Sequence, residues 1–131
     1  MKFRDMLTGA ALAALVVAPV PVLAADAAGE IVTATTHAEL AAKAGDLAGV
    51  QMHLHHALNC LAGPGGDGFD PKSMNPCANA GNGAIPDTSD AAKKSALTAA
   101  ATKAKAGLAA GDLATAQKDA SDAAAALKAI K

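Results

Sequence analysis

Two stretches of the 131-residue chain match each other at a spacing of 66 residues. Residues 37–52 and 103–118 share the run Ala-Gly-Asp-Leu-Ala, with its glycine at Gly45 and Gly111, and a glutamine follows at the same offset in both. Self-similarity of this kind indicates a repeated supersecondary unit. This repeat constrains the fold more than any other feature of the sequence.

The shared run has the composition of a short turn between two helices. A glycine at the end of a helical pattern ends the helix in a left-handed cap, which we expect at Gly45 and Gly111. The aspartate that follows caps the next helix and lies at its positive end. Each repeat is therefore predicted to be an α-hairpin. Thr36-x-x-Glu39 resembles a capping box, so the first helix begins either there or earlier, near Glu30.

Apolar residues recur at helical spacing in the expected helices, as a single stripe in each. The stripes are Leu47, Val50, Leu54, Leu58 and Leu61 within 47–61, Leu97, Ala101, Ala104 and Leu108 within 97–108, and Leu113, Ala116, Ala120, Leu127 and Ile130 within 113–130. After Pro86, Asp87 and Asp90 offer caps for the helix that contains Leu97. Because two hairpins give four helices, we predict an all-α fold, an up-down four-helix bundle.

The first 24 residues have the pattern of a cleavable secretory signal. Lys2 and Arg4 supply positive charge, an apolar run follows, and two prolines precede a small-residue cleavage site after Ala24. The apolar run is shorter than the ~20 residues that a membrane-spanning helix needs. We therefore expect residues 1–24 to be a signal peptide. The mature chain is expected to be periplasmic or secreted, without membrane insertion.

The remaining chain, 25–131, has the length of one domain. Within it we expect the first hairpin over 31–62 and the second hairpin over 90–131. The segment that joins them, 63–89, is dense in glycine and proline, which predicts a long loop without regular structure. A loop of this length in a compact domain is usually functional or disordered.

Composition and motifs exclude several classes of function. Beyond residue 24 there are nine lysines, no arginine, eleven acidic residues, and no tryptophan or tyrosine. Nucleic-acid binding usually needs a basic surface and aromatic rings, so no nucleic-acid partner is expected. Haem is not expected, because C-x-x-C-H is absent and an alanine-lined seam is too tight. Without G-x-S-x-G or a buried acid suited to a triad, we do not expect an enzyme.

The chain has two cysteines, Cys60 and Cys77. In an exported protein such a pair usually forms a disulfide, and the spacing is not C-x-x-C. The mature chain has 17 leucine, isoleucine, valine, methionine and phenylalanine residues, a thin core that needs another constraint. We expect the bridge to pin the loop and to stabilise the fold by about 3 kcal/mol. A thiolate metal ligand or a redox pair is the alternative.

All histidines fall in the first hairpin, and the second hairpin has none. They are His37, His53, His55 and His56. At about 100° per residue, His53, His56 and Cys60 form one outward stripe on their helix. His53 and His56, three residues apart, have Cβ atoms about 5–6 Å apart. His37 and His53 each lie eight residues from Gly45, so an antiparallel hairpin places them at the same height.

We interpret this group as a metal site. The expected ligands are His53 and His56 as primary donors, His37 as a third, and His55 and Met52 as auxiliary donors. Neutral imidazole suits copper, nickel and zinc, and a thioether adds a soft donor for Cu(I). Asp67 or Asp70 could reach the ion from the loop. The alternative is that the histidines are surface imidazoles packed beneath the loop.

The run Ala44-Gly-Asp-Leu-Ala-Gly-Val-Gln-Met-His53, with Leu58 following, has the pattern G-x₇-H-x₄-L. It resembles the small metal-binding proteins of the bacterial periplasm, which are built from repeated α-hairpins with a glycine turn. The resemblance implies that fold and metal binding, with His53 as a repeat histidine and Asp46 in place of another. That family is rich in histidine throughout, whereas this chain has four. The Gly-Pro-Cys loop is not part of its pattern.

The sequence therefore favours an exported helical protein that reversibly binds copper, nickel or zinc as a buffer or carrier. The alternative is a non-enzymatic module of the cell envelope. Such a module would dock a protein partner through the loop and the His53–Cys60 face, or would have a structural role.

Overall fold

The computed structural model describes residues 25–131, and the expected signal peptide, 1–24, lies outside these residues. The described chain forms five helices and no strand. The helices are α1 (Ala27–Lys43), α2 (Leu47–Ala62), α3 (Ala84–Asp87), α4 (Ala91–Ala109) and α5 (Leu113–Lys128). The all-α prediction is confirmed for this part of the chain. None of these helices is both long and apolar enough to cross a membrane.

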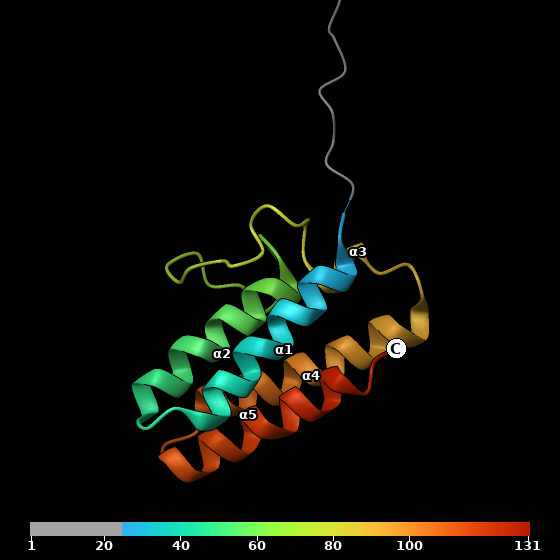
Figure 1. Cartoon of the computed structure of the whole chain (residues 1–131). Coiled ribbons are helices and arrows are strands. Elements are labelled where there is room, and N and C mark those ends of the chain that lie inside the picture. The colour runs from blue at the N-terminus through green and yellow to red at the C-terminus, as the bar shows by residue number, and fades with distance from the viewer. Residues whose placement is uncertain (1–24) are drawn as a thin grey trace, which may run out of the picture.

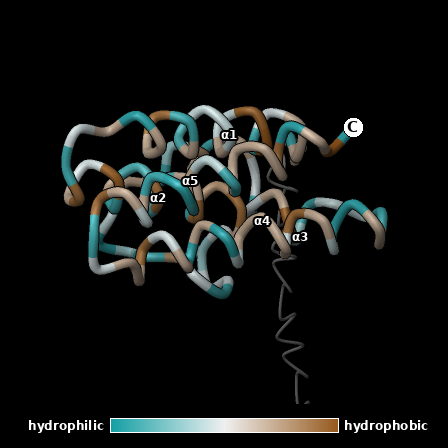
Figure 2. Tube along the Cα trace, turned by 90° about the horizontal axis from the view of Figure 1, so that it is seen from below, coloured by the Kyte–Doolittle hydropathy of each residue, from teal (hydrophilic) through white to brown (hydrophobic). Residues whose placement is uncertain are grey.

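The four long helices lie alongside one another, and the loop with α3 covers one end of them (Figure 1). The main packing partners of α1 are α2 and α5, and those of α4 are α5 and α2. Each long helix therefore buries two of its faces against neighbouring helices. Polar and apolar segments alternate along each long helix, as helices with solvent on their remaining face require (Figure 2).

Every long helix begins at an aspartate that accepts a hydrogen bond from the backbone N–H three residues later. The pairs are Asp26 with Gly29 at 2.9 Å, Asp46 with Gly49 at 2.7 Å, Asp90 with Lys93 at 2.7 Å, and Asp112 with Thr115 at 2.9 Å. Such caps satisfy an N–H group that has no partner within the helix. The predicted caps at Asp46, Asp90 and Asp112 are confirmed.

Of the two starts expected for the first helix, the earlier one, near Glu30, is close to the observed start at Ala27, and Thr36 and Glu39 lie inside α1 without forming a capping box. The prediction that Gly45 and Gly111 are left-handed is wrong, since positive φ angles in the described chain occur only at Gly63, Gly65, Gly68 and Gly83. The helices end at Lys43 and Ala109, and the extended backbones of their C-cap residues, Ala44 and Ala110, lead to the capping aspartates. The two turns thus have the same conformation, but without the expected cap.

Leucine from α2 and alanine from all four long helices make the core. The largest fully buried apolar side chains are Val50, Leu54, Leu58, Leu61, Leu97 and Leu127. Small residues allow the helices to approach closely: a Cβ atom added to Gly107 on α4 would lie 2.7 Å from Cδ1 of Leu54 on α2. The thin core expected from the composition is therefore compensated by close helix contacts.

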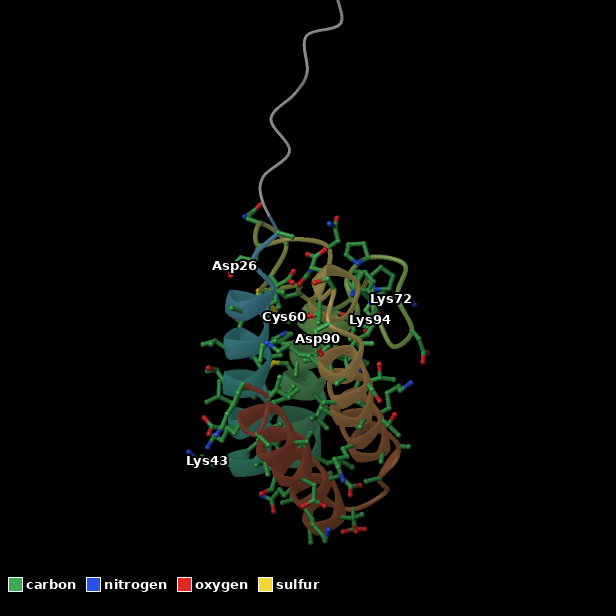
Figure 3. The ribbon with its side chains drawn as sticks, turned by 90° about the vertical axis from the view of Figure 1, so that its right-hand side faces the viewer. Asp26, Lys43, Cys60, Lys72, Asp90 and Lys94 are labelled. Atoms are coloured by element: carbon green, nitrogen blue, oxygen red, sulfur yellow. A yellow bond between two sulfur atoms is a disulfide. The ribbon has the colours of Figure 1, made fainter. Side chains whose placement is uncertain are left out.

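The loop is fixed to α2 by a disulfide and by one buried amide. Cys60 and Cys77 are bonded, as predicted, and both are buried. Cys60 lies near the end of the molecule that carries the loop with Lys72 (Figure 3). The fully buried Asn59 donates from Nδ2 to three loop carbonyls, those of Asp70, Ser73 and Met74. The loop also contains α3, so the prediction that 63–89 lacks regular structure is wrong in that part.

Candidate metal centre

The turn at Gly45 aligns the histidines of α1 and α2. His37 and His53 lie eight residues before and after this glycine, and their Nδ1 atoms are 3.2 Å apart. The prediction that the two rings lie at the same height is confirmed. Because this register follows from two well-capped helices, it is a property of the scaffold and not of a mobile loop.

His56 joins this pair to make a group of three. One ring nitrogen from each of His37, His53 and His56 lies within 4.8 Å of the other two. The ring centroids are 5.5 Å apart for His37 and His53, 5.0 Å for His37 and His56, and 5.8 Å for His53 and His56. Nitrogen ligands around one tetrahedral ion lie roughly 3.3 Å apart, given metal–nitrogen bonds of about 2.0–2.1 Å. Small side-chain rotations would therefore bring all three onto one ion.

The Nδ1 atoms of His37 and His53 lie at hydrogen-bond distance. At 3.2 Å, one Nδ1 can donate to the other when only one of the two carries a proton. Protonation of both Nδ1 atoms would place two donors against each other without an acceptor. The contact therefore fits one protonated Nδ1 atom and one Nδ1 lone pair.

Burial lowers the pKa of His37 and of His56 below the ordinary histidine value of 6.5. The next cause is neighbouring histidine charge, from His56 and His53 on His37, and from His53 and His55 on His56. No acidic side chain contributes to either shift. Both rings are therefore neutral at pH 7, which is the form that binds a metal.

The buried ring of His56 has an unsatisfied nitrogen. This residue is 7% exposed, and its Nδ1 has no hydrogen-bond partner among the described residues. Nearly all buried polar atoms in proteins are paired, and an unpaired one costs about 1–3 kcal/mol. Nδ1 of His55 is likewise unpaired, so an unpaired ring nitrogen occurs both inside and outside the group of three.

The other predicted ligands lie elsewhere. Nδ1 of His55 is 3.6 Å from Oδ2 of Asp70 in the loop, outside the group of three. The Ser73 hydroxyl also donates to Asp70, and this hydrogen bond is the largest cause of the lowered pKa of that carboxyl group. Asp67 pairs with Lys105 of α4 at 2.6 Å. Met52 is 49% exposed on α2, four residues before His56.

The outward stripe expected on α2 is not outward. His56 and Cys60 are buried, and His56 lies against His37 of α1, a main packing partner of α2. Helix α1 supplies His37 to this covered face. The group of three is thus an interhelical cluster with one buried and two half-buried rings, and not a surface patch beneath the loop.

Sequence reasoning missed two buried polar residues that hold this end of the molecule together. Asn59 binds the loop, as described above. Glu30 of α1 is fully buried, and its Oε1 accepts from the Gly83 N–H at 2.9 Å, while Oε2 has no partner among the described residues. A glutamate in the first turn of a helix looks like an ordinary dipole contact, so its sequence position carries no sign of burial.

Comparisons with known protein families, with curated proteins and with solved structures give no match for this chain. The interpretation of the site therefore depends on its own geometry. That geometry is three convergent imidazoles from two helices, one of them buried with an unpaired nitrogen.

Proposed function

We propose that this protein is exported and reversibly binds one copper, nickel or zinc ion through His37, His53 and His56, as a buffer or carrier without turnover. The observation that carries the proposal is the approach of three imidazole nitrogens to within 4.8 Å of one another. Imidazole is a preferred donor for these late first-row metals. Calcium and magnesium require oxygen ligands, which the group lacks.

Several features support exchange rather than permanent binding. His56 is buried, whereas His37 and His53 are half-buried, so an ion can reach the group from their side. Three protein donors are typical of sites that keep a further position open, whereas closed structural zinc sites have four. Such a position allows an incoming ligand to bind before the protein releases the ion.

The scaffold and its compartment fit this role. We interpret the four long helices as an up-down four-helix bundle, with residues 1–24 as the signal that exports it to the periplasm or beyond. The disulfide is compatible with an oxidising compartment. Donors on capped helices are held more precisely than donors on loops, and this favours binding of one ion at a defined position.

Calorimetric titration tests the proposal. The mature chain, 25–131 with its disulfide intact, is titrated with Cu(II) and with Zn(II), beside a His53→Ala/His56→Ala variant and a His55→Ala control. We expect one ion per chain with a micromolar or tighter Kd, retained in the control and lost in the double variant. Equally weak binding by all three proteins would contradict the proposal and would favour an interaction or structural module.

A further inference from the structure

The histidine cluster carries no negative charge. Within residues 25–131, the group of His, Cys, Asp and Glu side chains close enough to share one ion consists of three imidazoles. Both cysteines are in the disulfide, and no free thiol remains. The acids nearest in sequence have other partners, since Glu39 pairs with Lys128 and Asp46 caps α2. In the loop, Asp67 pairs with Lys105, and Asp70 accepts from Ser73 and faces His55.

A neutral donor set discriminates between ions by charge. The cost of moving an ion out of water grows with the square of its charge, so a divalent ion costs roughly four times as much as a monovalent one. Many sites for divalent ions offset this cost with thiolates or carboxylates, and three-histidine zinc sites do so through a metal-bound water whose pKa falls to about 7. Here a buried imidazole and two half-buried ones provide nitrogen lone pairs but no compensating charge.

Among the copper, nickel and zinc ions considered above, Cu(I) is the one with a single charge. We infer that the neutral cluster of His37, His53 and His56 takes Cu(I) in preference to Zn(II), Ni(II) and Cu(II). This inference rests on the proposed function, because it concerns the same site. It makes the protein a carrier of reduced copper in particular.

The test measures affinity for each oxidation state. The mature, disulfide-intact chain is titrated anaerobically with Cu(I) against bathocuproine disulfonate, with ascorbate as reductant, and separately with Zn(II), Ni(II) and Cu(II) against chelators of known affinity. Alkylation and mass measurement check that both cysteines stay oxidised. We expect Cu(I) to bind at least 100-fold more tightly than each divalent ion. Relative to Cu(II), this factor raises the potential of bound copper by about 120 mV.

A matched variant tests the physical reason. His37→Asp places one carboxylate at a donor position, and His53→Asp repeats the change on α2, with circular dichroism to confirm folding. We expect the ratio of Cu(I) to Zn(II) affinity to fall at least tenfold in whichever variant folds. An unchanged ratio would overturn the charge argument.

The outcomes separate this inference from the proposed function. If a divalent ion binds wild type as tightly as Cu(I), the preference is wrong while metal binding stands. If no ion binds at micromolar or tighter affinity, both are wrong.

Discussion

The two hairpins share a turn sequence and a turn conformation, but they carry different side chains at equivalent positions of their helices. The positions 66 residues after His37, His53 and His56 are Lys103, Asp119 and Asp122. Asp122 forms an ion pair with Lys118 at 2.7 Å. Its pKa is lowered chiefly by this hydrogen bond and also by the charge of Lys103, the counterpart of His37. The same positions therefore hold acidic and basic side chains in one hairpin and imidazoles in the other.

This difference separates what the scaffold supplies from what the residues supply. The short turn brings three positions on two helices together in both hairpins. Only the first hairpin is disulfide-bonded to the loop, through Cys60, and only there are the three residues histidines, one of them buried. Geometry thus comes from the repeat, and the proposed metal-binding capacity depends on histidine combined with burial.

Removing the disulfide should leave the first hairpin, like the second, without a disulfide bond to the loop. This change has the largest expected effect on stability. Cys60→Ala/Cys77→Ala frees a loop whose ends are 17 residues apart, which lowers the free energy of unfolding by about 3 kcal/mol. Urea denaturation measures the change, with reduced wild type as the control. A loss below about 1 kcal/mol would mean that Asn59 and the packed loop suffice without the bridge.

Exchanging the residues of the two hairpins should abolish metal-linked stability. At a free metal concentration of 100 times Kd, binding stabilises wild type by about 2.7 kcal/mol. The variant His37→Lys/His53→Asp/His56→Asp carries the second hairpin's residues and should gain nothing from the metal. Thermal or urea unfolding with and without metal measures this, and His55→Ala serves as a control that retains the gain. Equal stabilisation of wild type and the exchanged variant by the metal would contradict the proposal that the three histidines bind it.

Glu30, the buried acid of the first hairpin, has no acidic counterpart in the second hairpin. The equivalent position there is the exposed Ala96. Burial is the largest cause of the raised pKa of Glu30, opposed by the Gly83 N–H. Because the pKa of Glu30 in the folded protein is raised above 4.5, the protonated carboxyl group contributes favourably to the stability of the fold. This contribution is complete below pH 4.5 and is lost as the pH rises through the pKa of the folded protein.

Replacing this acid should therefore stabilise the protein at neutral pH. In Glu30→Gln, Oε1 still accepts from Gly83, and an amide replaces the unpartnered Oε2. We expect about 2 kcal/mol of added stability at pH 7, because the amide has no charge to desolvate or to be repelled by Asp87, and an uncompensated buried group costs about 1–3 kcal/mol. The gain is smaller near pH 4.5, where the carboxyl group is protonated. Urea denaturation at both pH values measures the difference in stability between the variant and wild type. Histidine titration affects both proteins equally and cancels in this difference. A gain that grows toward acid pH would contradict the raised pKa of Glu30.

The smallest expected effect concerns Met52, whose counterpart in the second hairpin is Lys118. Four residues apart on α2, the exposed Met52 and the buried His56 lie on successive turns of the helix, and a thioether is a soft donor. Met52→Leu should weaken Cu(I) binding about tenfold, or about 1.4 kcal/mol, and leave Zn(II) binding unchanged. Competition titration measures both ions. Unchanged Cu(I) affinity would exclude Met52 from the site.

The sequence predicted the positions of the helices and the pairing of His37 with His53. Both follow from local rules: aspartate caps start three of the helices as expected, and counting eight residues from Gly45 accumulates little angular error. The disulfide was predictable from the cysteine number and the expected export signal. These predictions need no knowledge of which helices are neighbours.

The burial of His56 did need that knowledge. A single-helix projection shows one apolar stripe on α2, but each long helix packs against two others, and the second contact covers the histidine face. The partners of Asn59 were equally out of reach, because they lie 11 to 15 residues away in an irregular loop. Gly45 was misjudged because glycine permits a left-handed backbone without requiring it.

The most direct test of the three-histidine site follows the imidazole nitrogens themselves. In ¹⁵N-labelled mature protein, long-range ¹H–¹⁵N spectra during titration with Zn(II) and, anaerobically, with Cu(I) report the ring nitrogens of each histidine separately. We predict that signals of His37, His53 and His56 shift together and are complete at one equivalent, while those of His55 keep their metal-free positions. Signals that move independently, or a shift confined to His55, would contradict a shared coordination centre between α1 and α2.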